Sequence, residues 1–173
     1  MTDAALRALL VDSFTRIREQ VSDLTDGLDE SSATFRPDAE ANSIAWLLWH
    51  LTRIEDDHVA HLAGEGQIWP TWRERFGLPF SEEDTGYGHS ANDVAQVRVS
   101  ADLLDGYQAD VHQAVLRYLE TVDSEEVDRV VDTRWDPPVT AGVRLVSVLG
   151  DAYQHLGQAA YVRGMAERAG AAQ

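Results

Sequence analysis

The sequence predicts an all-α fold, a four-helix bundle, and three observations support this prediction. Four long segments carry apolar residues at the three- and four-residue spacing of an amphipathic helix. Stretches rich in glycine, proline and serine separate these segments. No segment shows the two-residue alternation of a half-buried strand. Bundles of this kind can build metal sites from side chains on facing helices.

The first helix is expected from about residue 3 to residue 26, where leucine, isoleucine and valine recur at helical spacing. Gly27 is suited to end this helix. The stretch 29–40 contains a serine pair and an Arg-Pro-Asp sequence, so we expect a loop there.

The second helix is expected over about 42–62, with Asn42 or Ser43 as its N-cap and Gly64 just beyond its end. Residues 65–90 then form an unusually long connection between helices 2 and 3. A connection of this length in a small domain is typically functional or mobile.

The third helix is expected to begin after Ser90, because Ser90 is a good N-cap and Asp93 supports the first turn. Its apolar spacing continues to about Thr121, although Gly106 weakens the helix locally. The acidic stretch 122–139 is expected to be a connection with a short extended piece.

The fourth helix is expected from Thr140, its N-cap, to about Ala169. A chain of 173 residues fits one domain and can bury a sizeable core, so residues 1–173 are expected to form a single domain.

The charge of the chain argues against two classes of partner. It has 30 acidic and 14 basic residues, for a net charge of −16. Such a chain repels phosphate backbones and anionic lipids, so neither nucleic acid nor a membrane surface is an expected partner. No apolar run reaches 18 residues, and no signal peptide is visible, so the expected location is cytoplasmic.

Two histidines and one aspartate form a candidate metal site. Asp151 and His155 are four residues apart, so on a helix they lie on one face. If the second helix packs against that face, His50 supplies a third ligand. Since the chain has no cysteine, any metal must be held by His, Asp or Glu. Three protein ligands leave open coordination positions, as in catalytic sites.

A structural alternative must be set beside this interpretation. The Asp-x-x-x-His pattern is common in helices, and a histidine on an apolar helix face is more often a core residue with a satisfied hydrogen bond. The metal interpretation gains support because two helices each place a histidine on the inward face.

The residues around these histidines resemble those of a known superfamily. Trp46-Leu47-Leu48-Trp49-His50-Leu51, and Arg144 followed by Asp151-x-x-x-His155-x-Gly157-Gln158-Ala159, resemble the DinB-like superfamily. They are most similar to the mycothiol-dependent S-transferases and the N-terminal domain of mycothiol-dependent maleylpyruvate isomerase. The resemblance implies an up-down-down-up four-helix bundle that holds a divalent metal. It also implies that His50, Asp151 and His155 are the ligands.

The chain departs from the pattern of these families in four places, two of which are Ala160 and Gly164, where acidic residues are frequent. Asp151 stands where Glu or His is usual, and its carboxylate is one methylene shorter. Gln158 stands where a histidine is frequent. Arg163 matches the arginine that often closes the motif.

The resemblance also implies an activity. Two imidazoles and a carboxylate suit Zn²⁺ best, with Ni²⁺, Fe²⁺ or Mn²⁺ as alternatives. A thiol that coordinates such a metal is deprotonated. The expected reaction is therefore detoxification, in which a low-molecular-weight thiol of the mycothiol type attacks an electrophilic small molecule.

Two other functions remain open at this stage. One is a non-catalytic helical bundle, which could form a homodimer and use its metal structurally or hold none. The other is a metal-dependent hydrolase of the same fold, because metal-bound hydroxide can attack an ester or amide.

Four further residues are candidates for substrate binding. Arg144 could bind a substrate carboxylate or pair with an acidic neighbour, and Arg163 is equally open. Asp57 and His61 could line a substrate channel. The favoured interpretation of 55–58 is a solvated charge run near a helix end.

The remaining aromatic residues have less specific interpretations. Three tryptophans could form a rim over the pocket, but sealing the end of the bundle is favoured; they are Trp69, Trp72 and Trp135. Three histidines are expected at the surface; they are His58, His89 and His112.

Overall fold

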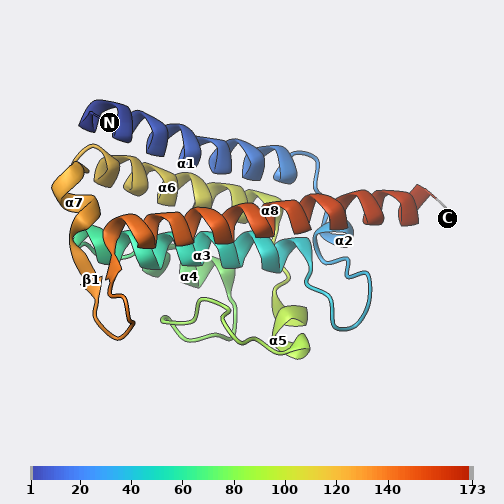
Figure 1. Cartoon of the computed structure of the whole chain (residues 1–173). Coiled ribbons are helices and arrows are strands. Elements are labelled where there is room, and N and C mark those ends of the chain that lie inside the picture. The colour runs from blue at the N-terminus through green and yellow to red at the C-terminus, as the bar shows by residue number, and fades with distance from the viewer. Residues whose placement is uncertain (1, 172–173) are drawn as a thin grey trace.

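The computed structural model describes residues 2–171 and is mostly helical, as the sequence predicts (Figure 1). The helices and strands, in chain order, are α1 (Asp3–Thr25), α2 (Glu30–Ala33), α3 (Ile44–Ala63), α4 (Trp69–Phe76), α5 (Ala91–Gln96), α6 (Ala101–Leu119), α7 (Ser124–Asp128), β1 (Val130–Asp132), β2 (Val139–Thr140) and α8 (Ala141–Ala171). The two short strands pair antiparallel.

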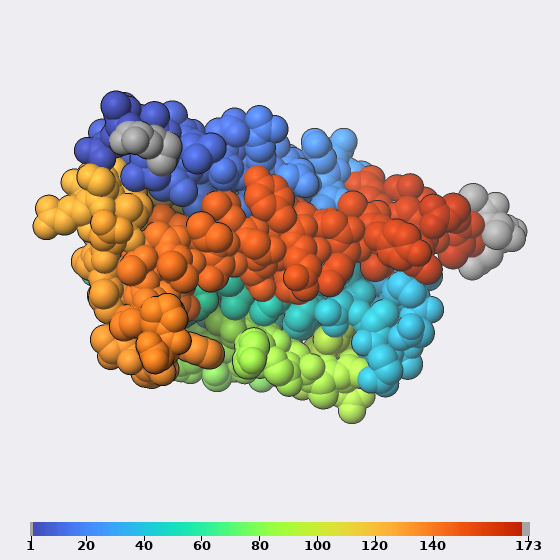
Figure 2. All heavy atoms as spheres, viewed as in Figure 1, coloured from blue at the N-terminus to red at the C-terminus, as the bar shows by residue number. Residues whose placement is uncertain are grey.

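The four long helices lie side by side and enclose the core. Helix α3 packs against α8 and α6, and α1 packs against the same two helices. Helices α1 and α8 run in one direction and α3 and α6 in the other (Figure 1). Figure 2 shows α8 lying across one face of the molecule, with α1 on one side of it and the chain that follows α3 on the other.

The ends of α3 follow from its sequence. The hydroxyl of Ser43 accepts a hydrogen bond from the backbone N–H of Trp46 at 3.2 Å, so Ser43 is the N-cap. The helix ends at Gly64, which adopts the left-handed conformation (φ 68°) that closes helices. The heavily apolar first half of α3 is buried on nearly all sides, because other segments surround it.

The continuous third helix was a wrong prediction. Ser90 caps α5 in a capping box with Asp93, as expected, but α5 ends at Gln96. Ser100 then caps α6 by accepting from the N–H of Leu103. The four residues between the two helices include buried valines on both sides of Arg98. A second serine cap and these β-branched residues favour a break, because β-branched residues are poor helix formers.

The predicted connections contain short helices that the sequence pattern did not predict. The 29–40 loop includes α2, and the 65–90 connection includes α4. The stretch 122–139 holds α7 and also β1, which is the short extended piece expected there. Thr140 accepts from the N–H of Val143 at 3.3 Å and thus caps α8 as predicted.

No helix within residues 2–171 is both long and apolar enough to cross a membrane.

Candidate metal centre

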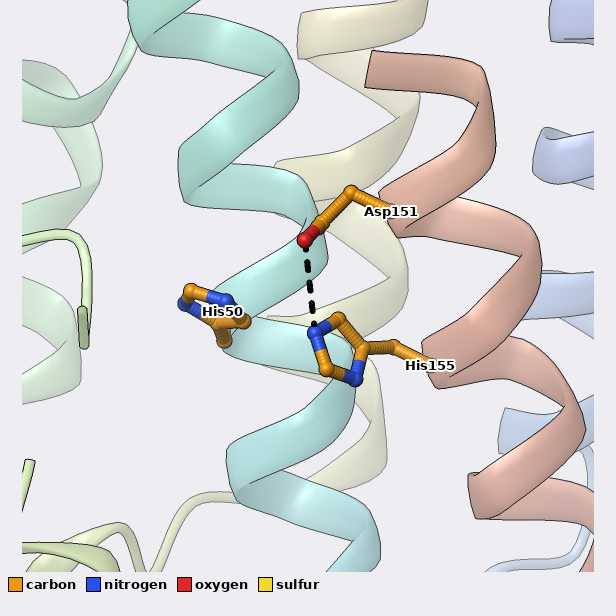
Figure 3. Close-up of side chains that lie close together, drawn as sticks. All are labelled: His50, Asp151 and His155. Atoms are coloured by element: carbon orange, nitrogen blue, oxygen red, sulfur yellow. Dashed lines mark ion pairs between the residues drawn. The ribbon is translucent and has the colours of Figure 1, made fainter. Parts of the chain in front are cut away.

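The structure brings His50, Asp151 and His155 together between α3 and α8 (Figure 3). One donor atom from each residue lies within 4.8 Å of the others. Two ligands of one Zn²⁺ ion lie at most about 4 Å apart, given bonds of about 2 Å. Small side-chain rotations therefore suffice for these three residues to share an ion.

The carboxylate of Asp151 has an unsatisfied oxygen. Its Oδ1 lies 3.5 Å from His155 Nε2, and its Oδ2 is buried without a hydrogen-bond partner. A buried carboxylate oxygen without a partner is costly. A bound cation would remove this cost, so the residues fit a metal. The Asp151 side chain is 32% exposed, whereas the residues His50 and His155 are only 5% and 9% exposed, so Asp151 is the most solvent-exposed of the three.

Hydrogen bonds fix the tautomer of both imidazoles. The carbonyl oxygen of Thr85 can only accept, so His50 Nδ1 donates to it at 2.5 Å. His155 Nδ1 likewise donates to Gln158 Oε1 at 2.8 Å. The neutral form of each ring therefore carries its proton on Nδ1 and has Nε2 available for a metal. Such partners on the far nitrogen orient metal-binding histidines and raise their basicity.

The two imidazoles differ in their proton affinity. Burial lowers the pKa of His50, and the hydrogen bond to Thr85 offsets only part of this effect. Burial also acts to lower the pKa of His155, but the hydrogen bonds with Asp151 and Gln158 outweigh it, and the net shift is upward. At neutral pH, His50 is therefore held as the neutral ligand form.

Trp46 forms a wall of the centre. Its ring stacks on His50, with centroids 4.7 Å apart and planes 15° apart, and meets His155 edge-on at 6.2 Å. Because this wall is apolar, it keeps water away from one side of the ligands and strengthens electrostatic interactions there.

The buried Arg53 holds the 65–90 connection against α3, near the metal centre. Arg53 has no exposed surface, and it donates to the backbone carbonyls of Asp84 at 3.0 Å and Glu82 at 3.1 Å. These bonds hold the chain just before Thr85, whose carbonyl binds His50. Sequence reasoning missed this role of Arg53, because the residue lies far from its partners along the chain.

The interpretation of 55–58 as a solvated charge run was wrong for Glu55 and Asp56, whereas Asp57 and His58 are partly exposed. Glu55 has no exposed surface, and Asp56 is 3% exposed. Asp56 accepts hydrogen bonds from the backbone N–H groups of Ile68 and Trp69, at 2.8 Å each, and from the hydroxyl of Tyr107 at 2.7 Å. It thereby caps α4 from another helix. The long connection packs over this turn of α3 and buries it.

Asp57 and His61 lie outside the cluster of three ligands. Asp57 lies 3.2 Å from His58 and accepts a hydrogen bond from the amide of Gln67 at 2.8 Å. His61 is exposed.

The two candidate arginines have protein partners. Arg144 lies 3.5 Å from both Asp132 and His58, so it has the acidic neighbour considered above. Arg163 donates to the backbone carbonyls of the last residues of α1 and its C-cap, at 2.9–3.0 Å, and pairs with Glu167. Its guanidinium thus covers carbonyls that have no partner within α1.

The other histidines and tryptophans divide between core and surface. The surface prediction was wrong for His112, which is 5% exposed, and for His89, whose side chain is 8% exposed. His58 is partly exposed. Trp69 and Trp72 are buried against Phe76 and Tyr107. The sealing role expected of Trp135 was wrong, because this residue is 65% exposed.

The chain is similar to known proteins in sequence and in fold. The profile of the family described as Mycothiol-S-transferase matches residues 9–167. A crystal structure described as the conserved protein of locus from Enterococcus faecalis superposes with a TM-score of 0.83 and is 31% identical in sequence. The match covers 90% of this chain and 94% of that one. No functionally curated protein matches the chain.

Proposed function

The chain belongs to the mycothiol S-transferase family, and we propose that it is a metal-dependent enzyme that transfers a mycothiol-type thiol to an electrophilic small molecule. One observation carries the proposal. Two imidazoles whose neutral forms carry the proton on Nδ1, and a buried, unpartnered carboxylate oxygen, converge from α3 and α8.

His50, Asp151 and His155 would hold the metal, for which Zn²⁺ is the best fit to two nitrogens and one oxygen. When bound, such a metal lowers the pKa of a coordinated thiol, so that a thiolate is present at neutral pH. Thr85 and Gln158 keep the two imidazoles in the ligand tautomer. Trp46 excludes water from one side.

The fold supports this proposal. We infer that residues 1–173 form one DinB-like domain, in which α1, α3, α6 and α8 make an up-down-down-up bundle. The packing of α3 on α8 supports this arrangement, because it is the contact that joins His50 to the other two ligands.

Arg144 is the best-placed candidate for substrate recognition. It lies seven residues before Asp151 on the same helix, which is two turns along the same face. Its side chain is 22% exposed, and its 3.5 Å contact with Asp132 is long for an ion pair. A substrate carboxylate could therefore compete with Asp132. Arg163 and Asp57 are weaker candidates, since they make shorter hydrogen bonds within the protein, at 3.0 Å and 2.8 Å. His61 is also a weaker candidate, because it is exposed.

The first experiment measures thiol consumption with a set of electrophiles, before and after metal removal. We expect activity that depends on added Zn²⁺ and is lost in His50→Ala and Asp151→Ala. Gln154→Ala is the matched control, because Gln154 is exposed on the same helix between two ligands. Normal turnover by metal-free His50→Ala would refute the proposal.

The same protein samples also test the two alternative functions, a bundle with a structural metal and a metal-dependent hydrolase. A metal that raises stability without supporting any thiol consumption indicates a structural site. Hydrolysis of esters or amides without a thiol indicates a hydrolase, since water is then the nucleophile.

A further inference from the structure

We propose that His89 and Asp84 are positioning residues of the metal centre, which act on the ligand His50 through Trp46. The inference rests on the proposed metal centre and adds the residues that hold one of its ligands in place. His89 was expected at the surface, but its side chain is only 8% exposed, and the geometry assigns it this role instead.

A continuous series of contacts joins Asp84 to His50. Asp84 Oδ1 lies 3.5 Å from His89 Nε2. The indole N–H of Trp46 donates to His89 Nδ1 at 3.2 Å. The ring of Trp46 then stacks on His50 with only 15° between the planes. The orientation of the His50 ring therefore depends on where Trp46 is held.

His89 is itself fixed in one state. The indole N–H can only donate, so His89 Nδ1 must accept, and its Nε2 carries the proton that faces Asp84. The ring is buried against Trp49, with centroids 5.7 Å apart, and Phe80, with centroids 4.5 Å apart. A buried imidazole with both nitrogens engaged is a rigid support for Trp46.

The same stretch of chain restrains His50 a second time. The carbonyl of Thr85 accepts from His50 Nδ1, at the edge of the ring, while Trp46 covers its face. Two restraints in different directions leave the His50 ring little freedom to rotate. Its Nε2 therefore stays available to a metal ion that Asp151 and His155 would also bind.

His89 is not itself a ligand. Within residues 2–171, the metal-binding group comprises only His50, Asp151 and His155. The Nδ1 of His89 is occupied by the indole of Trp46. Its effect on a metal must therefore be indirect, and partners that orient metal ligands typically change affinity by about 10- to 100-fold.

The first test measures metal binding. Zn²⁺ affinity and the absorption spectrum of the Co²⁺-loaded protein are compared in the wild type, His89→Leu and His89→Gln. Glutamine can still accept from Trp46 and donate to Asp84, so His89→Gln should retain the affinity and the Co²⁺ spectrum. His89→Leu should lose affinity by about tenfold and shift the spectrum. Tyr87→Ala is the control, because Tyr87 lies on the same loop but is 90% exposed.

A second variant removes the hydrogen bond between Trp46 and His89 from the Trp46 side. Trp46→Phe keeps an aromatic face on His50 but has no N–H to donate to His89. We expect it to weaken Zn²⁺ binding as His89→Leu does, and the double variant should be no weaker than either single one, because both break the same series of contacts. Additive losses, or a Zn²⁺ affinity of His89→Leu equal to that of Tyr87→Ala, would overturn the inference.

A second measurement separates this inference from the metal proposal. The tautomer of His50 in metal-free protein can be read from long-range ¹H–¹⁵N NMR spectra. We expect the Nδ1–H form alone in the wild type and in His89→Gln. In His89→Leu we expect a mixture of tautomers, because a His50 ring that Trp46 no longer holds can rotate away from the Thr85 carbonyl. A mixture there supports the positioning role even if the wild type binds no metal. A pure Nδ1–H form in a folded His89→Leu protein counts against it.

Discussion

Gly86 lies directly against the imidazole of His50. A Cβ added at Gly86 would be 2.9 Å from His50 Nδ1 and 2.9 Å from the ring of Trp49, closer than real Cβ contacts. The backbone of Gly86 also has a φ of +93°, which residues with side chains rarely adopt. This position thus requires glycine both for its conformation and for the approach of the loop to the metal ligand.

Gly86→Ala should therefore lower both stability and metal affinity. Strain at a positive φ costs about 1–3 kcal/mol, and the added methyl group must also displace the loop from His50. Gly88→Ala is a matched control, since Gly88 has a φ of +77° but no neighbour within 4 Å of an added Cβ. Urea unfolding and Zn²⁺ titration should show a stability loss in both variants and an affinity loss in Gly86→Ala alone. Equal Zn²⁺ affinities in the two variants would mean that the loop does not restrain His50.

Metal binding should stabilise the protein through Asp151. Zn²⁺ at 100 to 1,000 times its dissociation constant should raise the free energy of unfolding by about 3–4 kcal/mol. The increase in melting temperature should vanish after chelation and should not occur in Asp151→Ala. It should persist in Gln154→Ala. A full Zn²⁺ effect in Asp151→Ala would show that the ion binds elsewhere.

The helices of this protein could be predicted because their signals are local. Helix α3 begins after Ser43, whose side chain caps it, and ends at Gly64, which adopts the left-handed conformation. Both features depend only on residues that are close in the sequence. The four-residue spacing of Asp151 and His155 places them on one face of any helix. Adding His50 to this pair required the further assumption that α3 packs against α8. The contact between these two helices confirms that assumption.

The roles of Arg53, Asp56 and His89 could not be predicted from spacing alone. Arg53 and Asp56 look like ordinary surface charges, and His89 lies in a polar, glycine-rich stretch. Arg53 and Asp56 bind residues of the 65–90 connection, and His89, which lies in that connection, binds Trp46 of α3. The local sequence pattern does not specify how such a long connection folds back onto a helix. The length of this connection was the one available signal that α3 would be covered.

Arg163 should contribute to stability rather than to metal binding. Its guanidinium donates to the carbonyls of Asp23, Leu24 and Asp26, which would otherwise lack partners at the end of α1. Arg163→Ala should lower the free energy of unfolding by about 1.5–3 kcal/mol, the usual range for hydrogen bonds that involve a charged group. Urea unfolding provides the measurement.

Arg16→Ala is the comparison for Arg163→Ala, because Arg16 makes a side-chain pair with Asp12 at the surface and is 62% exposed. We expect a change below about 1 kcal/mol there. Unchanged stability of Arg163→Ala together with a raised KM for the thiol or electrophile would instead indicate a substrate-binding role for Arg163.

Glu55 should make the stability of the protein depend on pH. Burial raises the pKa of Glu55 from 4.5 to about 8, the hydrogen bond from Gln108 opposes this shift, and the nearby Asp56 adds to it. One oxygen of Glu55 has no partner. Between pH 4.5 and about pH 8, the folded protein retains the proton on the Glu55 carboxyl, whereas the unfolded chain releases it. Stability from this residue is therefore fully present below about pH 4.5 and is lost as the pH rises toward 8.

Glu55→Gln should remove this dependence, because glutamine fills the same space and cannot ionise. The variant should match the wild type near pH 5 and exceed it at pH 8 by a few kcal/mol, since one pKa unit corresponds to about 1.4 kcal/mol. Urea unfolding at several pH values measures the difference, and Glu19→Gln, at an exposed position of α1, provides the control. A difference between Glu55→Gln and the wild type that is constant from pH 5 to 8 would show that Glu55 is already ionised in the folded protein. A partner for its carboxylate would then have to exist inside the α3–α6 interface.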